Sequence, residues 1–140
     1  MRIRIAVLDD LTGIKAIADK NARSIGFLLK AAVVEFIEKG CMIVAVEEHE
    51  VAGFLRFRHR RDNVIKIYEI CVRDLSRRKG VGTATINKMM VIAEKLGAER
   101  IELKCPLGSE ANAFYRDIGF LRVGVVKGRV RKLVNWTKNI

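Results

Sequence analysis

Proline is nearly absent from the chain, with one among 140 residues, whereas half of the residues are hydrophobic. Disordered chains are usually rich in proline and poor in apolar residues, so this composition predicts a folded protein. No apolar run approaches the roughly 20 residues of a membrane-spanning helix, and the longest obvious one, Cys41–Val46, has the length of a strand. The first residues, Met1–Arg4, lack the apolar stretch of a signal peptide. We therefore expect one domain over residues 1–140, in the cytoplasm and without a membrane partner.

Cysteine is also scarce, and the three cysteines are far apart, at positions 41, 71 and 105. This spacing matches neither a set of metal ligands nor a framework of paired disulfides. Each cysteine falls in or beside a predicted strand, where a small buried side chain is the ordinary role. We expect free thiols and no metal.

Acidic residues are few relative to basic ones: 16 Asp and Glu stand against 27 Lys and Arg, which gives a formal charge of +11. Such a charge attracts polyanionic ligands and makes nucleic acid a candidate partner. The densest basic run, Arg56–Asn63, places arginines and a histidine around one phenylalanine. Runs of this kind occur at strand ends and in solvated loops as well as on nucleic-acid surfaces, so both interpretations stay open.

The chain is organised around the stretch Val64–Gly97. Val64–Val72 is β-branched and aromatic, and it is apolar on both faces except at Lys66 and Glu69, as expected of a buried central strand. From Ala84 onward, apolar residues recur at spacings of three and four, which predicts an amphipathic helix that ends at Gly97.

A basic, glycine-containing turn joins this strand to this helix, and it reads R-R-K-G-V-G-T from Arg77 to Thr83. The start of a helix presents unpaired backbone N–H groups and the positive end of the helix dipole. Gly80 and Gly82 lack a Cβ, which lets an anion approach the main chain closely. The turn therefore predicts a phosphate-binding site. It matches neither the Walker pattern nor the dinucleotide-binding fingerprint.

The pattern Arg-x-x-Gly-x-Gly after a strand, filled by Arg77, Gly80 and Gly82, resembles the pyrophosphate-binding loop of the GCN5-related N-acetyltransferases (GNAT superfamily). The segment Ala111–Phe120 is similar to the late signature of that family, in which a helix carries a tyrosine and ends in Gly-Phe. The resemblance extends over residues 2–126 in element order. It implies an α+β fold (an α/β/α sandwich) with a mixed, mostly antiparallel sheet of about seven strands, splayed at the centre, and four helices.

The resemblance implies acetyl-CoA as the acetyl donor. Backbone N–H groups of the turn would hold its diphosphate, and the central strand would bind the pantetheine arm and polarise the thioester carbonyl. The cofactor-binding residues are then Ile70, Cys71, Val72, Arg77, Arg78, Lys79, Gly80, Val81, Gly82 and Thr83. The chain departs from the family at Gly108, where an asparagine often contacts the cofactor. Asn112, one helical turn further on, cannot be assumed to replace it.

Three acid–base candidates follow from the same resemblance. Tyr115 matches the tyrosine that protonates the departing thiolate, and packing alone is the alternative for it. Glu69 or Glu102 is the candidate base for the attacking amine, and the alternative for each is a structural acid paired with Arg or Lys. Phe27 and Leu28 lie where the family builds one wall of the acceptor cleft, and core packing is the alternative for both.

The remaining pattern predicts strands at residues 3–7, 41–46, 51–57, 100–105, 120–126 and 130–136. Three further helices are predicted. The first runs from Asp9 to an interruption at Ser24–Phe27, and the second runs from Leu28 to Gly40 with Leu29 toward the core. The third is short, begins after Ser109 and ends at Ile118.

The sequence thus predicts a single N-acetyltransferase domain that moves an acetyl group from acetyl-CoA to a primary amine by direct attack on the thioester. The positive charge disfavours polycationic acceptors. Acetylation of aminoacyl-tRNA and a non-catalytic module that binds acyl-CoA or nucleic acid stay open as alternatives. A second copy of the chain is an open partner.

Overall fold

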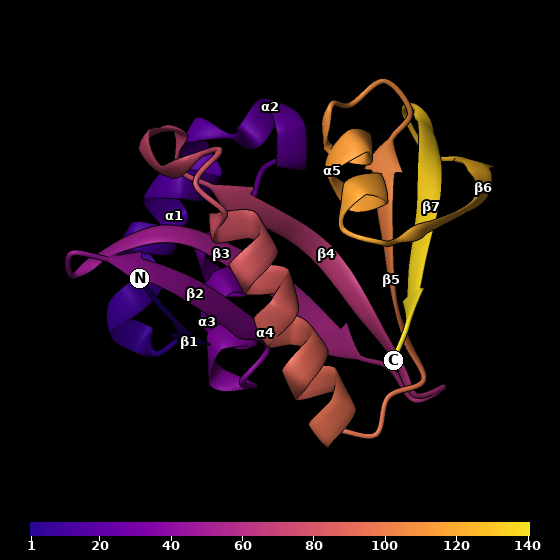
Figure 1. Ribbon diagram of the computed structural model, residues 1–140. Coiled ribbons are helices and arrows are strands. Elements are labelled where there is room, and N and C mark those ends of the chain that lie inside the picture. The colour runs from indigo at the N-terminus through magenta and orange to yellow at the C-terminus, as the bar shows by residue number, and fades with distance from the viewer. The chain divides into compact units, whose positions relative to one another are not determined.

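The computed structural model describes residues 1–140, which form one seven-stranded sheet and five α-helices (Figure 1). The strand order is β1-β2-β3-β4-β5-β7-β6. The strands are β1 (Arg2–Ile5), β2 (Met42–Glu47), β3 (Glu50–His59), β4 (Val64–Val72), β5 (Arg100–Pro106), β6 (Leu121–Lys127) and β7 (Lys132–Asn139). The helices are α1 (Leu11–Lys20), α2 (Ala22–Ile25), α3 (Lys30–Glu38), α4 (Val81–Lys95) and α5 (Ala111–Asp117), with short 3₁₀ helices η1 (Leu8–Asp10) and η2 (Asp74–Ser76).

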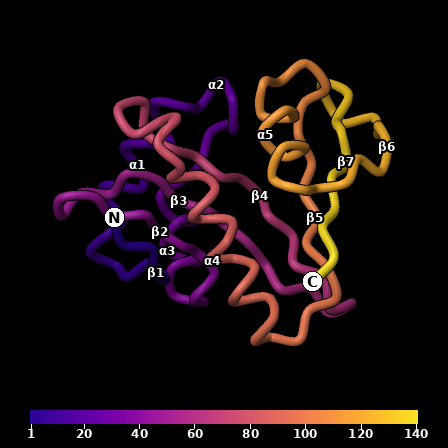
Figure 2. Tube along the Cα trace, viewed as in Figure 1, coloured from indigo at the N-terminus to yellow at the C-terminus, as the bar shows by residue number.

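The chain divides into two compact units. The first comprises residues 1–57 and 69–92, and the second comprises residues 58–68 and 93–140. Strand β4 contributes to both, since residues 64–68 belong to the second unit and residues 69–72 to the first. The colours of the trace in Figure 2 follow the residue numbers along the chain.

The first unit is an antiparallel β1-β2-β3 meander with a core shared with the N-terminal helices. In β2, four consecutive residues from Met42 to Ala45 are fully buried, so both faces of this strand are covered. Ile14 of α1, Val33 of α3 and Phe54 of β3 join Met42 in the core with no exposed surface. Burial of these apolar side chains is the main source of stability in this unit.

The second unit is built on a long antiparallel ladder between β5 and β7, which runs from Arg100↔Asn139 to Pro106↔Leu133. On its other side, β5 pairs in parallel with β4, and this ladder ends at Ile67↔Leu103. Strand β6 is the sheet edge and pairs with β7, with an irregularity between Arg122 and Gly124. Alternate β5 residues, Ile101, Leu103 and Cys105, are buried, which leaves Glu102 and Lys104 on the opposite face.

The predicted α+β class and the seven-stranded mixed sheet are confirmed, and β4 has the predicted bounds. The prediction of four helices is wrong by one, because α1 ends at Lys20 and residues 22–25 form a separate four-residue helix, α2, which contains Ser24 and Ile25 of the predicted interruption. Leu29 is 59% exposed rather than buried, because it precedes the first residue of α3 instead of lying within it. No helix is long and apolar enough to cross a membrane.

An ion pair fixes the connection from β1 to α1. The guanidinium of Arg4 donates to both Asp10 oxygens, at 2.7 and 2.9 Å, and the Val7 N–H donates to the same carboxylate at 2.8 Å. Burial alone would raise the pKa of the Asp10 carboxyl, but the hydrogen bonds from Arg4 and Val7 and the Arg4 charge lower it below its ordinary value.

A carboxyl group whose pKa is lowered on folding stabilises the protein above its unfolded-state pKa of about 3.9, and this stabilisation is lost as the pH falls through the folded-state value. We predict that Asp10→Asn lowers the free energy of unfolding by about 1.5–3 kcal/mol at pH 7, since it removes hydrogen bonds to a charged group. The difference from wild type should shrink below about pH 4. Urea unfolding at both pH values checks this, with Asp9→Asn as the matched control, because Asp9 is exposed and makes no ion pair. Equal losses for both variants would contradict the prediction.

Candidate functional site

The turn between η2 and α4 has the backbone of an anion-binding loop. Arg77 is extended, and then Arg78 and Gly80 both adopt positive φ, at 61° and 80°, before α4 begins at Val81. Glycine at position 80 is explained by this conformation rather than by lack of space, because no atom lies within 4 Å of an added Cβ. Successive N–H groups in a turn conformation can form a concave nest that binds anions.

These N–H groups have no acceptor within the protein. The last backbone N–H before α4 that has an acceptor is that of Arg77, which donates to the Asp74 carbonyl. The first N–H within the helix that has an acceptor is that of Ala84, which donates to the Gly80 carbonyl at 3.0 Å. The six residues from 78 to 83 donate no backbone hydrogen bond between these points. Such a cluster at a helix N-terminus binds phosphate oxygens well, since the helix dipole adds to the donors.

Of the three basic side chains of the turn, one forms hydrogen bonds within the protein and two have no partner. Arg77 donates to the Val72 carbonyl at 3.1 Å and to the Asn21 side-chain oxygen at 2.6 Å, so it holds the turn against β4 and the end of α1. Arg78 and Lys79 are exposed and make no ion pair or hydrogen bond. The structure therefore places Arg77 among the groups that position the turn, and leaves two cations at its surface.

The residues Ile70, Cys71 and Val72 form the end of β4 that enters the turn. Cys71 is 6% exposed, and burial raises the pKa of its thiol to about 11, although the nearby Arg77 charge opposes the rise. Gly53 of β3 lies so close that an added Cβ would be 2.9 Å from the Cys71 carbonyl oxygen. This close approach explains the glycine within β3.

Glu69, one of the two candidate bases, is engaged by a single partner. Both of its carboxylate oxygens accept from Arg56, at 2.5 and 3.1 Å, and its side chain is 9% exposed. The Arg56 guanidinium also lies over the ring of Phe36, 4.6 Å from its centroid. This geometry agrees with the alternative of a structural acid.

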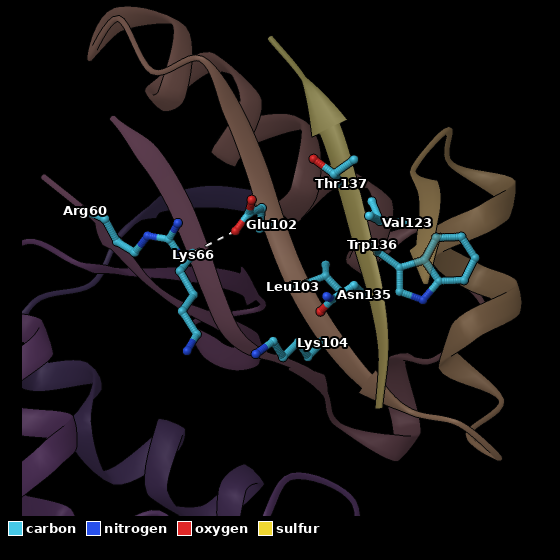
Figure 3. A pocket seen from close by; sticks show the side chains of 9 residues that line it. All are labelled: Arg60, Lys66, Glu102, Leu103, Lys104, Val123, Asn135, Trp136 and Thr137. Carbon is cyan, nitrogen blue, oxygen red and sulfur yellow. Dashed lines mark ion pairs between the residues drawn. The ribbon is translucent and has the colours of Figure 1, made fainter. Parts of the chain in front are cut away.

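Glu102, the other candidate base, lies in the second unit at a cavity of about 240 Å³ (Figure 3). Its side chain is 34% exposed and pairs with Arg100 at 3.0 Å and with Arg60 at 3.3 Å. Unlike Glu69, this carboxylate reaches an open space that a second molecule can enter.

Tyr115 is held in an aromatic cluster of the second unit. It is 6% exposed, and its ring lies edge-on to Phe114 and Phe120, with centroids 5.3 and 5.7 Å away. The ring of Trp136 lies 6.5 Å away. Packing of this kind fixes the direction of the phenol group.

Asn112 does not take the place of the asparagine that the family often has where this chain has Gly108. Its amide nitrogen donates to the Pro106 and Ser109 carbonyls, at 2.9 and 3.0 Å, and its oxygen accepts from the Trp136 indole at 2.8 Å. The side chain is thus used to join α5 to β7. The space around Gly108 is open, with no atom within 4 Å of an added Cβ.

The two residues predicted to contact the acceptor, Phe27 and Leu28, differ in their exposure to solvent. Leu28 is 7% exposed and belongs to the core of the first unit, which agrees with the packing alternative. Phe27 is 74% exposed, and the Lys15 ammonium lies 4.8 Å from its ring centroid. Only Phe27 has a surface that a substrate could contact.

The first unit therefore brings together the turn at residues 77–83, the end of β4 and Glu69, while Glu102 and Tyr115 belong to the second unit. Sequence reasoning missed the other polar residues of the cavity, namely Arg60, Lys66, Lys104, Asn135 and Thr137. Side chains two residues apart in a strand lie on the same face of the sheet. This alternation in β5 (residues 102 and 104) and in β7 (residues 135 and 137) could have indicated that part of this set shares one face. The cytoplasmic location and the nucleic-acid and second-copy partners stay predictions.

A family model described as the acetyltransferase (GNAT) family matches residues 14–120. The chain belongs to this family. A relative described as an uncharacterized N-acetyltransferase of Methanocaldococcus jannaschii is 41% identical over 69 residues, which cover 49% of this chain but only 30% of the relative. The chain therefore aligns with less than a third of that protein's length.

Solved structures share the whole fold of this GNAT chain. Ard1 of Thermoplasma volcanium superposes with a TM-score of 0.89 at 17% identity, covering 99% of this chain and 97% of that one. The PaiA N-acetyltransferase of Thermoplasma acidophilum, crystallised with coenzyme A, gives 0.87 at 15% identity, covering 99% and 98%. At these identities the likeness shows the fold.

The Cys71 thiol gives a test of the environment at the end of β4. Because its pKa rises from 9.0 to about 11, we predict that iodoacetamide labels Cys71 at least about 100-fold more slowly at pH 8 than in the denatured chain. Mass spectrometry of labelled peptides resolves the three cysteines, and half-buried Cys41 serves as the internal comparison. Labelling of Cys71 that is as fast as in the denatured chain would contradict the assigned burial.

Proposed function

We propose that this chain transfers an acetyl group from acetyl-CoA to a primary amine. The observation that carries the proposal is the run of six unpartnered N–H groups between the structural side chain of Arg77 and the first helical bond of α4. The turn carries the Arg-x-x-Gly-x-Gly pattern that resembles the pyrophosphate loop of the family to which the chain belongs.

The turn fits a diphosphate in both charge and donor chemistry. A hydrogen bond from a backbone N–H to a charged acceptor contributes roughly 1.5–3 kcal/mol, so several of them account for most of the affinity. The exposed side chains of Arg78 and Lys79 contribute less, about 0.2–1 kcal/mol each, because water and salt screen them. The main chain, rather than the cations, is the principal binding group.

Acetyl-CoA supplies an activated thioester, and the chain's residues favour direct attack over a covalent intermediate. A cysteine must be a thiolate to act as a nucleophile. The Cys71 thiol, whose pKa burial raises to about 11, stays protonated at neutral pH. The acceptor amine is then the nucleophile.

A lysine-like amine with a pKa near 10.4 must lose its proton first, which costs about 4–5 kcal/mol at pH 7. Both candidate bases pair with arginine through both oxygens, and Glu102 is favoured because its side chain is 34% exposed at the cavity, whereas that of Glu69 is 9% exposed. In this proposal Glu102 takes the proton directly or through water, and Glu69 orders the end of β4 through Arg56.

Tyr115 is the proposed donor to the departing sulfur. Its ring is fixed by Phe114, Phe120 and Trp136, so its hydroxyl has one direction. Complete transfer from a phenol (pKa about 10) to a thiolate (pKa about 8.5) is uphill by about 2 kcal/mol. Stabilisation of the developing thiolate by a hydrogen bond therefore suffices for the role.

The test of the proposal is calorimetric titration with acetyl-CoA, followed by an amine screen with mass detection. Gly82→Val places a branched side chain beside the free N–H groups, and we predict at least a tenfold rise in Kd, equivalent to about 1.4 kcal/mol or more. Lys79→Ala should raise Kd by less than about fivefold, since it removes only an exposed charge.

The matched control is Gly124→Val in β6, where no atom lies within 4 Å of an added Cβ and no change in Kd is expected. A larger effect of Lys79→Ala than of Gly82→Val would overturn the assignment of affinity to the main chain. Absence of acetyl-CoA binding by the wild-type protein would overturn the proposed function.

A second prediction concerns Tyr115. Replacement by phenylalanine keeps the aromatic packing and removes only the hydroxyl, so we expect kcat to fall by about 10²–10⁴-fold while the Kd for acetyl-CoA stays within about twofold. Steady-state kinetics with a responsive amine, together with calorimetry, measures both. Unchanged turnover would remove Tyr115 from the mechanism.

A further inference from the structure

The cavity of the second unit lies on the open face of three strands, and the ladders define its layout. Lys66, Glu102 and Thr137 form one row across β4, β5 and β7, since Lys66 pairs with Glu102 and Glu102 with Thr137. Lys104 and Asn135 are partners in the row two residues further along β5. Figure 3 shows the side chains of these rows around the cavity.

The edge strand β6 also contributes to the cavity, at an irregularity in its pairing with β7. Arg122 pairs with Trp136 and Gly124 pairs with Asn135, so Val123 is an extra residue between two consecutive positions of β7. Val123 contributes to the lining of the cavity. Bulges of this type bend a strand and redirect a side chain, and they are frequent beside binding sites.

The charges of the cavity do not balance. Its lining holds the three cations Arg60, Lys66 and Lys104 and a single carboxylate, Glu102. That carboxylate is already neutralised by Arg60 at 3.3 Å and by Arg100 at 3.0 Å. Arg60 in turn pairs with Asp62 at 2.6 Å, so the arginines and carboxylates of this region satisfy one another.

The two lysines are left without a carboxylate. The Lys66 ammonium lies 4.9 Å from the centroid of the Tyr68 ring, a contact that keeps its full charge available. Lys104 makes no ion pair or hydrogen bond, and neither does the amide of Asn135 beside it. Two ammonium groups and an amide N–H₂ on neighbouring positions are donors suited to an oxyanion.

The size of the cavity limits what that oxyanion belongs to. At about 240 Å³ it is smaller than the roughly 300–1,000 Å³ of sites that enclose drug-sized ligands, and this size suits a single small group such as a carboxylate or a phosphate. Glu102, the proposed base, faces the same space. An anionic group bound to the lysines would thus lie near the amine that Glu102 deprotonates, at a separation of about one side-chain length.

We infer that Lys66, Lys104 and Asn135 form a subsite for a carboxylate or phosphate group of the acceptor, so that the preferred substrate is an amine that carries an anionic group nearby. This inference rests on the proposed acetyl transfer. The subsite also disfavours a second positive charge, which excludes polyamines as good acceptors. The same two cations favour the neutral, nucleophilic form of the bound amine.

The subsite is tested first by binding, without catalysis. Inorganic phosphate and glutarate are titrated separately into the ¹⁵N-labelled wild-type protein, with chloride at matched ionic strength as the control. We expect saturable shifts of the Lys104, Asn135 and Thr137 amide signals. The Kd should rise at least tenfold in the double variant Lys66→Gln/Lys104→Gln. It should stay within twofold in Lys95→Gln, an exposed lysine of α4 without an ion pair, and in Lys66→Arg/Lys104→Arg, which keeps both charges.

The second arm measures acetylation of matched dipeptide amides that differ only at the second residue: Gly-Glu, Gly-phosphoserine and Gly-Gln. We expect kcat/KM for at least one anionic dipeptide to exceed that for Gly-Gln by about tenfold or more, and this preference to vanish in the Lys66→Gln/Lys104→Gln variant. Comparison of the two anionic dipeptides distinguishes a carboxylate from a phosphate acceptor.

Equal use of all three dipeptides, or an unchanged preference in the double variant, would overturn the inference. So would anion titrations that leave the three amide signals unmoved. Saturable anion binding without acetylation of any amine would count against the proposed transferase instead, and acetyl-CoA titration of the same samples separates the two failures.

Discussion

A deficit of hydrogen-bond acceptors at the start of α4 determines how this molecule can function. Buried or clustered N–H groups without partners are rare in folded proteins, because the protein normally provides an acceptor. Here Arg77 holds the turn in place by donating to the Val72 carbonyl and to the Asn21 side-chain oxygen, and its guanidinium has no acceptor atom that could pair with the N–H groups. The free donors are thus held in place by a residue that does not compete for them.

The ionic groups follow the same division between structure and binding. The carboxylates Asp10, Glu69 and Glu102 each accept from arginine, and these pairs fix chain connections or strand faces. Arginine suits this role because its planar group holds two oxygens at once. Among the cations without an ion pair, Arg78 and Lys79 lie at the turn, and Lys66 and Lys104 lie at the cavity. The net charge of +11 therefore includes two local groups of cations at which we expect anions to bind, in addition to its general steering of anionic ligands.

Local pattern was sufficient to predict much of the fold. The apolar run of β4 gave its bounds, and the helical spacing from Ala84 and the glycine at 97 gave the start and end of α4 within three residues. The turn was recognisable because its proposed function depends on the main chain and on glycine, and glycine positions are visible in a sequence. The error at Leu29 arose because helical spacing continues into the residue before a helix begins.

What the sequence could not show depends on partners far apart along the chain. Glu69 and Arg56 are 13 residues apart, and Asn112 meets Trp136 across 24 residues, so neither pairing has a local signal. The cavity needs residues of three strands and a bulge at Val123. Candidate acids could be named from their strand positions, but which of them lies at an open space required the structure.

Hydrogen–deuterium exchange of the backbone, resolved by NMR with and without coenzyme A, tests the central claim most directly. The account predicts that the amides of Arg78 to Thr83 exchange rapidly in the free protein and become protected when coenzyme A binds, while amides in the middle of α4 change little. Amides of this turn that are protected without the cofactor, or that stay unprotected at saturating coenzyme A, would contradict it.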